Sequence, residues 1–110
     1  MRYEIVFAPG AAADLKALST PLRTGVKDAI ERHLRHEPSR VSKSRIKRLR
    51  GLSQPQYRLR VDDIRVFYDV TKTQVQILAV VTKEQAQAWL EEQGTRGGGT
   101  ESRGAGGSEG

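Results

Sequence analysis

The sequence predicts an α+β domain in which an N-terminal strand and a helical hairpin pack on a mostly antiparallel sheet of four or five strands, with a short helix at the end. Apolar residues recur every four positions over residues 22–34, which indicates a helix, and they alternate with polar residues over 57–70, which indicates strands. The stretch VQILAVV at 75–81 is apolar on both faces, which is typical of a central strand. From this order of elements we expect the helices on one face of the sheet.

The chain begins with a strand and a short helix. Residues 2–9 alternate, with Tyr3, Ile5 and Phe7 on one face, and Pro9 and Gly10 end the strand. The alanines and leucines of residues 11–18 predict a first helix.

A longer helix follows directly. Thr20 can cap it, with Pro21 at its first position, and Pro38 stops the helical pattern. Its apolar face consists of Leu22, Val26, Ile30 and Leu34.

The C-terminal half predicts the sheet and the last helix. Residues 39–54 are polar and basic, although RIKRLRG at 45–51 can supply a short strand. The final helix starts at a capping box formed by Thr82 and Gln85. Its apolar stripe consists of Ala86, Trp89 and Leu90.

The pattern YRLRVDDIRVFYDV at 57–70 predicts a hairpin with a two-residue turn at Asp62 and Asp63. In this register Arg60 lies opposite Arg65, and side chains alternate between two faces. One face is core and consists of Tyr57, Leu59, Val61, Ile64, Val66, Tyr68 and Val70. The other face consists of Arg58, Arg60, Arg65, Phe67 and Asp69.

Composition limits the class of protein. The chain has 110 residues, no cysteine, no apolar run long enough to cross a membrane and no signal peptide pattern at its start, so we expect a cytoplasmic protein. Eight of its eleven glycines lie in residues 94–110, which predicts a disordered tail after a domain at 1–93.

The positive charge is concentrated in one part of the chain. The formal net charge is +6, yet residues 40–65 alone hold nine basic and two acidic residues, a net of +7. This favours a polyanionic partner, nucleic acid above all, over a solvated basic face that serves solubility.

Arginines on neighbouring strands repel each other, so a sheet selected for stability alone would avoid them. Their fixed, permanently charged guanidinium groups form a site for phosphodiesters. Alternatively, Asp62, Asp63 and Asp69 neutralise the cluster and leave an ordinary surface.

The string RIKRLRGLSQPQYRLRVDDIRVFYDV, followed by a buried strand and a helix, resembles the RelE/ParE superfamily of toxins from type II toxin–antitoxin modules. The resemblance covers residues 1–93 and implies the RelE-like fold. The RelE branch implies a toxin that cleaves messenger RNA on the ribosome and inhibits translation. The ParE branch implies action on DNA gyrase without the basic catalytic cluster.

The resemblance to the ribonuclease branch also implies roles for particular residues. Arg58, Arg60 and Arg65 match its catalytic basic positions, and Lys83 matches a further one. Trp89 stands where a tyrosine is common, and an indole can only stack on a base or pack in the core. The basic residues expected to contact ribosomal RNA are Arg45, Lys47, Arg48 and Arg50.

The chemistry then rests on basic residues. His33 and His36 lie three apart on the predicted second helix without carboxylates at ligand spacing, so we expect surface residues there, no metal site and no cofactor. RNA supplies its own nucleophile, the 2′-hydroxyl. We assign Arg60 and Arg65 to the phosphate oxygens and Arg58 to the leaving side. Lys83, if it lies near the arginines, is a candidate for proton transfer.

The resemblance implies a cognate antitoxin as partner, which would cover the basic face, and binding of operator DNA by the complex through the antitoxin. Two alternatives remain open at this point. One is a gyrase inhibitor with the same fold. The other is an inactive relative whose arginine face only binds an antitoxin or nucleic acid.

Overall fold

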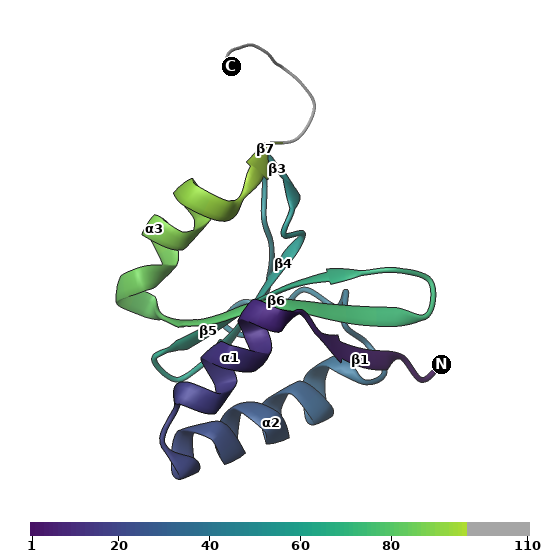
Figure 1. Cartoon of the computed structure of the whole chain (residues 1–110). Coiled ribbons are helices and arrows are strands. Elements are labelled where there is room, and N and C mark those ends of the chain that lie inside the picture. Colours follow the sequence, from purple (N-terminus) through teal and green to yellow (C-terminus); the bar gives the residue numbers. More distant parts are fainter. Residues whose placement is uncertain (97–110) are drawn as a thin grey trace.

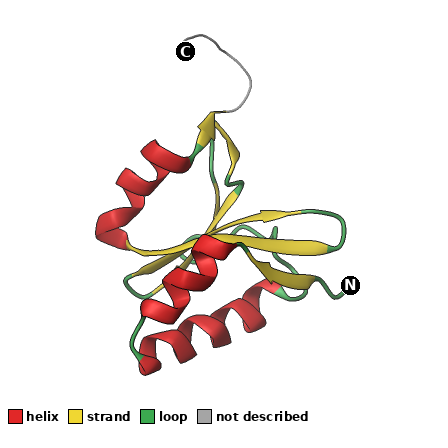
Figure 2. Ribbon diagram, viewed as in Figure 1, coloured by secondary structure: helices red, strands yellow, loops and turns green. Residues whose placement is uncertain are grey.

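A five-stranded sheet forms the centre of the fold, and the computed structural model describes residues 1–96 (Figures 1 and 2). In spatial order its strands are β1 (Glu4–Phe7), β6 (Gln74–Thr82), β5 (Ile64–Val70), β4 (Tyr57–Val61) and β2 (Ile46–Arg48). β1 runs parallel to β6, and all other neighbours in this sheet are antiparallel. The predicted α+β class is confirmed, as is the short strand within RIKRLRG.

The helical hairpin covers one face of this sheet and consists of α1 (Pro9–Ala17) and α2 (Thr20–Leu34). Helix α1 begins two residues earlier than expected, because proline fits the first helical position, where its missing N–H needs no partner. The cap of α2 is Ser19 and not Thr20: the Ser19 hydroxyl accepts a hydrogen bond from the Leu22 N–H at 3.5 Å. Both hydroxyl residues are good caps, so their order alone did not decide between them.

Leu22 is 47% exposed, so its expected place on the apolar face of α2 was wrong. Val26, Ile30 and Leu34 are buried as predicted. A four-residue step advances about 40° beyond a full turn of an α-helix, so three steps carry Leu22 roughly 120° away from Leu34.

The main core lies between the hairpin and the sheet. It consists of Ala11, Leu15, Val26, Ile30, Leu34, Ile46, Leu59, Ile64, Val66, Tyr68, Val75, Ile77 and Val80. Tyr3, Ile5 and Phe7 of the first strand region pack against it, as their alternation predicted.

The third helix, α3 (Lys83–Gln93), lies on the opposite face, so the expectation of helices on one face was wrong. The predicted capping box of Thr82 and Gln85 starts this helix. Beneath it, Phe67 and Ala79 are register partners on β5 and β6 and are both 1% exposed. A second small core therefore forms under α3, where the sequence predicted an exposed face.

A two-stranded sheet joins the end of α3 to the loop before β4. It consists of β3 (Leu52–Gln54) and β7 (Thr95–Arg96), which run antiparallel. The described chain thus continues past the expected domain end at residue 93, while residues 97–110 of the expected tail lie outside the described residues. Among residues 1–96, no helix is both long and apolar enough to cross a membrane.

Candidate active site

The hairpin of β4 and β5 places the arginines as predicted. Arg60 lies opposite Arg65, and Arg58 lies opposite Phe67. Asp62 adopts a φ of 52°, in the left-handed region that a tight turn requires and that aspartate tolerates better than most residues. The predicted register is therefore confirmed, and with it the separation of core and arginine faces.

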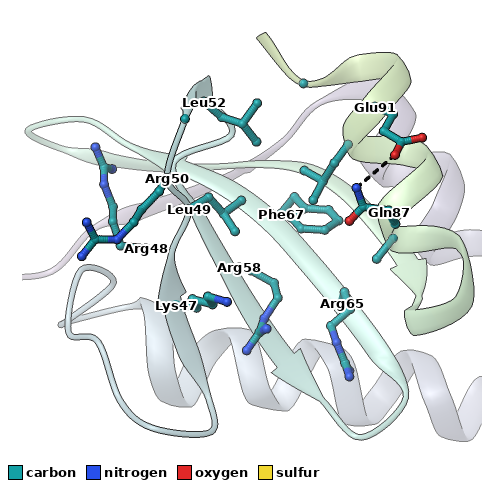
Figure 3. Close-up of a pocket in the computed structure, with 14 residues that line it drawn as sticks. Lys47, Arg48, Leu49, Arg50, Leu52, Arg58, Arg65, Phe67, Gln87 and Glu91 are labelled. Carbon is teal, nitrogen blue, oxygen red and sulfur yellow. Dashed lines mark hydrogen bonds between the residues drawn. The ribbon is translucent and has the colours of Figure 1, made fainter. Parts of the chain in front are cut away.

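Strand β2 adds a third basic residue to this face. Lys47 is the register partner of Arg58, so the two side chains leave the sheet on the same side. Figure 3 shows Lys47, Arg58 and Arg65 side by side on three neighbouring strands. The sheet thus holds a row of cations that no single stretch of sequence contains.

These side chains line a groove of about 600 Å³ between the sheet and α3. Its basic lining consists of Lys47, Arg48, Arg50, Arg58 and Arg65. Leu49, Leu52 and Phe67 supply apolar surface, and α3 contributes Ala86, Gln87, Leu90 and Glu91. A groove of this size and mixed character is typical of a ligand site.

Arg58 is the most perturbed cation of the groove. It is half-buried, and its Nε is buried with no hydrogen-bond partner in the structure. Burial, followed by the positive charges of Arg65 and Arg60, lowers the pKa of Arg58 below its ordinary value. A guanidinium still keeps its charge at neutral pH. Arg58 therefore lines the groove with a charged guanidinium that no carboxylate pairs, which is a favourable partner for an oxyanion.

Arg65 is held by the hairpin backbone. Its Nη1 donates to the carbonyl of Asp62 at 2.7 Å and to that of Ile64 at 3.1 Å. Both bonds use the same nitrogen of the guanidinium. The other two nitrogens, Nε and Nη2, have no partner among the hydrogen bonds of residues 1–96. Arg65 is thus oriented and still able to donate to a ligand.

Arg60 is exposed and does not line the groove. It lines a separate hollow of about 280 Å³ with Ser44, Arg45 and Asp62. Its charge nevertheless reaches the groove, since it contributes to the lowered pKa of Arg58.

The aspartates do not neutralise the cluster. Asp69 is 8% exposed, and its carboxylate accepts from the Gln54 side chain at 2.8 Å and from the Gln56 N–H at 2.7 Å. Asp63 pairs with Lys83, with 3.5 Å between Oδ1 and Nζ. Within the described part of the chain, no carboxylate forms an ion pair with Arg58, Arg60 or Arg65.

Two residues expected in the site lie beside the groove. Lys83 is exposed, pairs with Asp63 at the tip of the hairpin and does not line the groove. Trp89 stacks on Phe67 with ring centroids 5.1 Å apart, and it does not line the groove either. One face of the indole is therefore covered by the protein, which makes Trp89 part of the support for α3.

The four basic residues expected to contact ribosomal RNA take two positions. Lys47, Arg48 and Arg50 line the groove, and the Arg48 guanidinium lies 5.0 Å from the ring centroid of Tyr57. Arg45 instead lines two smaller hollows, one of them with His33 and His36.

Two polar groove residues on α3 were not predicted. Gln87 and Glu91 lie one helical turn apart, and the Gln87 amide donates to the Glu91 carboxylate at 3.1 Å. The i, i+4 spacing was visible in the sequence. Their position on the groove was not, because α3 was expected on the other face of the sheet. Among residues 1–96, no cluster of three or more histidine or carboxylate side chains could hold a metal ion.

The fold is that of the RelE-like toxins. The chain is similar to a chain of the RelBE2 toxin–antitoxin complex from Mycobacterium tuberculosis, with 27% identity, a TM-score of 0.62, and 74% of this chain and 99% of the other covered. It is also similar to a chain of the RelB-RelE antitoxin–toxin complex from Methanococcus jannaschii, with 22% identity, a TM-score of 0.57, and 76% and 96% covered. It is similar as well to a chain of the DinJ-YafQ toxin–antitoxin complex from E. coli, with 14% identity, a TM-score of 0.60, and 79% of this chain and 97% of the other covered. No curated protein sequence gives a significant match.

Residues 5–87 match the family described as the ParE toxin of the type II toxin–antitoxin system, parDE. The chain belongs to this family, within the RelE/ParE superfamily of toxins.

Proposed function

We propose that this toxin is a metal-independent endoribonuclease that cleaves messenger RNA on the ribosome and so inhibits translation. The observation that carries the proposal is the groove with Arg58, Arg65 and Lys47 on neighbouring strands, where none of the three is paired with a carboxylate among the described residues. Three adjacent cations on a sheet cost stability. A site for a phosphodiester accounts for that cost.

The reaction needs alignment and charge stabilisation. The RNA 2′-hydroxyl loses its proton to water and attacks the adjacent phosphorus, the bond from phosphorus to the 5′-oxygen breaks, and a 2′,3′-cyclic phosphate forms. The 5′-oxygen takes up a proton from water and leaves as a hydroxyl. Negative charge increases on the non-bridging phosphate oxygens during this step, and fixed guanidinium groups stabilise it. Arginine cannot serve as the base, since its pKa lies far above neutral.

The contacts in the groove support a changed assignment of roles. Two features support Arg65 and Arg58 as the residues that bind the phosphate oxygens: two backbone carbonyls orient Arg65, and the Arg58 guanidinium lines the groove without an acidic partner. Arg60 lies outside the groove and acts on an approaching phosphate through its charge. Lys83 remains a candidate for proton transfer only if its pair with Asp63 opens.

The absence of a strong base in this assignment favours dependence on the ribosome, which would hold the messenger in a reactive geometry. The exposed cations Arg45, Arg48 and Arg50 would then contact ribosomal RNA phosphates without reading sequence. By similarity to the complexes above, a cognate antitoxin would bind this toxin and cover its basic groove. Binding of operator DNA would belong to the antitoxin.

A second candidate function is inhibition of DNA gyrase, and the match to the family described as the ParE toxin favours it. That function gives no reason for Arg58 and Arg65 to share an unneutralised groove. We therefore place it second. A third possibility, an inactive binding module, predicts no effect on growth.

Induction of the full chain in a bacterium without its antitoxin separates the three. RNA ends are mapped within minutes, DNA breaks are measured in parallel, and Arg65→Ala is compared with Arg2→Ala, a substitution of an arginine that lies outside the groove. We expect fresh ends within translated messages that disappear in Arg65→Ala and persist in Arg2→Ala. Growth arrest with intact messages and broken DNA would contradict the proposal in favour of gyrase.

A further inference from the structure

One acidic residue lies in an otherwise basic groove. Among the described residues that line it, Glu91 is the one with a carboxylate, and it forms no ion pair with the cations there. A negative charge weakens binding of a phosphate backbone, so a site that only bound phosphates would gain by its loss. The position of Glu91 therefore suggests a contact with another part of the nucleotide.

The groove has two chemically different ends. Figure 3 shows Arg58 and Arg65 on the strands and Gln87 with Glu91 on α3, with apolar Phe67 between them. Phosphate belongs at the arginine end. A base attached to the same nucleotide would cross the apolar middle, whose side chains suit its flat faces, and would bring its edge to α3.

The groups at the α3 end select among bases. The Glu91 carboxylate is acceptor-only, and one of its oxygens already receives a hydrogen bond from Gln87. That bond orients the carboxylate and leaves acceptor positions on both oxygens. Guanine alone presents two adjacent donors, N1–H and the N2 amino group, on its Watson–Crick edge, and a carboxylate matches them as a bidentate acceptor. Uracil presents one N–H between two carbonyl oxygens, which a carboxylate repels.

We propose that Glu91, oriented by Gln87, is a specificity-determining residue that reads a guanine base in the RNA held by the groove. The inference rests on the proposed function, since it assumes that RNA is the ligand. It adds to that function a base preference and an assigned reader.

The test uses four trinucleotides, 5′-U-N-U with N varied, carrying 2′-O-methyl groups so that they cannot be cleaved. Binding to the full chain is followed by NMR titration, which measures dissociation constants into the millimolar range. We expect the guanine RNA to bind about tenfold tighter than the uracil RNA, within the range for a bidentate base contact. In Glu91→Gln this ratio should fall below about twofold, because an amide cannot accept both hydrogen bonds.

Glu92→Gln is the matched control, because it makes the same charge change one residue away and outside the groove. It should keep the preference for guanine. Equal binding of the four RNAs to the unmodified chain, no binding of any of them, or a preference that survives in Glu91→Gln would overturn the inference.

Arg58→Ala separates this failure from failure of the proposed function. Weaker binding of all four RNAs in that variant supports an RNA site even if the bases are not distinguished. Binding that is unchanged in Arg58→Ala would count against the RNA site itself.

Discussion

Replacement of Arg58 by methionine should stabilise the fold while it removes a groove cation. The buried, unpartnered Nε costs about 1–3 kcal/mol in a dry site. Repulsion from Arg65, diagonally across the two strands, and from Arg60 on the same strand adds to this cost. Because the side chain is only half-buried, solvent screens much of this cost, and we expect a net gain of roughly 1 kcal/mol. Methionine keeps the apolar stem and so preserves its packing.

Thermal denaturation of the full chain, followed by circular dichroism at low salt, measures this gain. For a domain of this size it corresponds to a rise of about 4–8 °C in Tm. Arg48→Met is the control: it also removes a groove arginine, but one whose guanidinium lies over the Tyr57 ring, so it should lower Tm slightly. A lower Tm for Arg58→Met would refute the reasoning, since it would mean that the guanidinium stabilises the folded state.

Three further predictions concern the fold. Tyr68→Phe should lower the free energy of unfolding by about 1–2 kcal/mol in urea titrations, because the buried hydroxyl donates to the Pro38 carbonyl at 2.6 Å; an unchanged value would mean that water replaces the donor. Gly94→Ala should lower the free energy of unfolding by about 1–3 kcal/mol in the same assay, because the added Cβ would lie 2.5 Å from the Leu90 carbonyl oxygen. An unchanged free energy of unfolding would mean that the backbone at β7 shifts without cost and would contradict this prediction. Burial and neighbouring arginines lower the pKa of His33 in the folded protein, so the unfolded chain binds a proton at this position more readily. The free energy of unfolding should therefore fall as the pH drops below about 6.5. His33→Gln should reduce this dependence on pH, and an unchanged dependence would show that His33 is not its source.

The local pattern of the hairpin predicted its geometry because one turn sets the register of both strands. With Asp62 and Asp63 in the turn, the alternation of side chains over 57–70 follows without reference to the rest of the chain. The arginine face was accessible from sequence for this reason.

The second core under α3 has a signal in the sequence. The run at 75–81 is apolar on both faces, and Phe67 lies on the arginine side, so both faces of the sheet needed cover. One cover is the hairpin and the other is α3. The groove exists because α3 covers the Phe67 end of that face and leaves the Arg58 side open.

Other parts of the site depend on contacts between distant segments. The strand that places Lys47 beside Arg58 is three residues long, and nothing local sets its register. The pairing of β3 with β7 joins residues more than forty positions apart, without an apolar pattern in either. Glu91 enters the groove only through the position of α3. These features follow from tertiary packing, which the hydrophobic periodicity of the sequence does not predict.

The groove arginines can be tested most directly by single-turnover cleavage of a messenger on purified ribosomes, with Arg65→Ala compared to the unmodified chain at saturating toxin. The account predicts cleavage by the unmodified chain and a loss of about 10²–10³ in the rate for Arg65→Ala, as for removal of one charge-stabilising donor. An undiminished rate in the variant, or no cleavage by the unmodified chain, would contradict it.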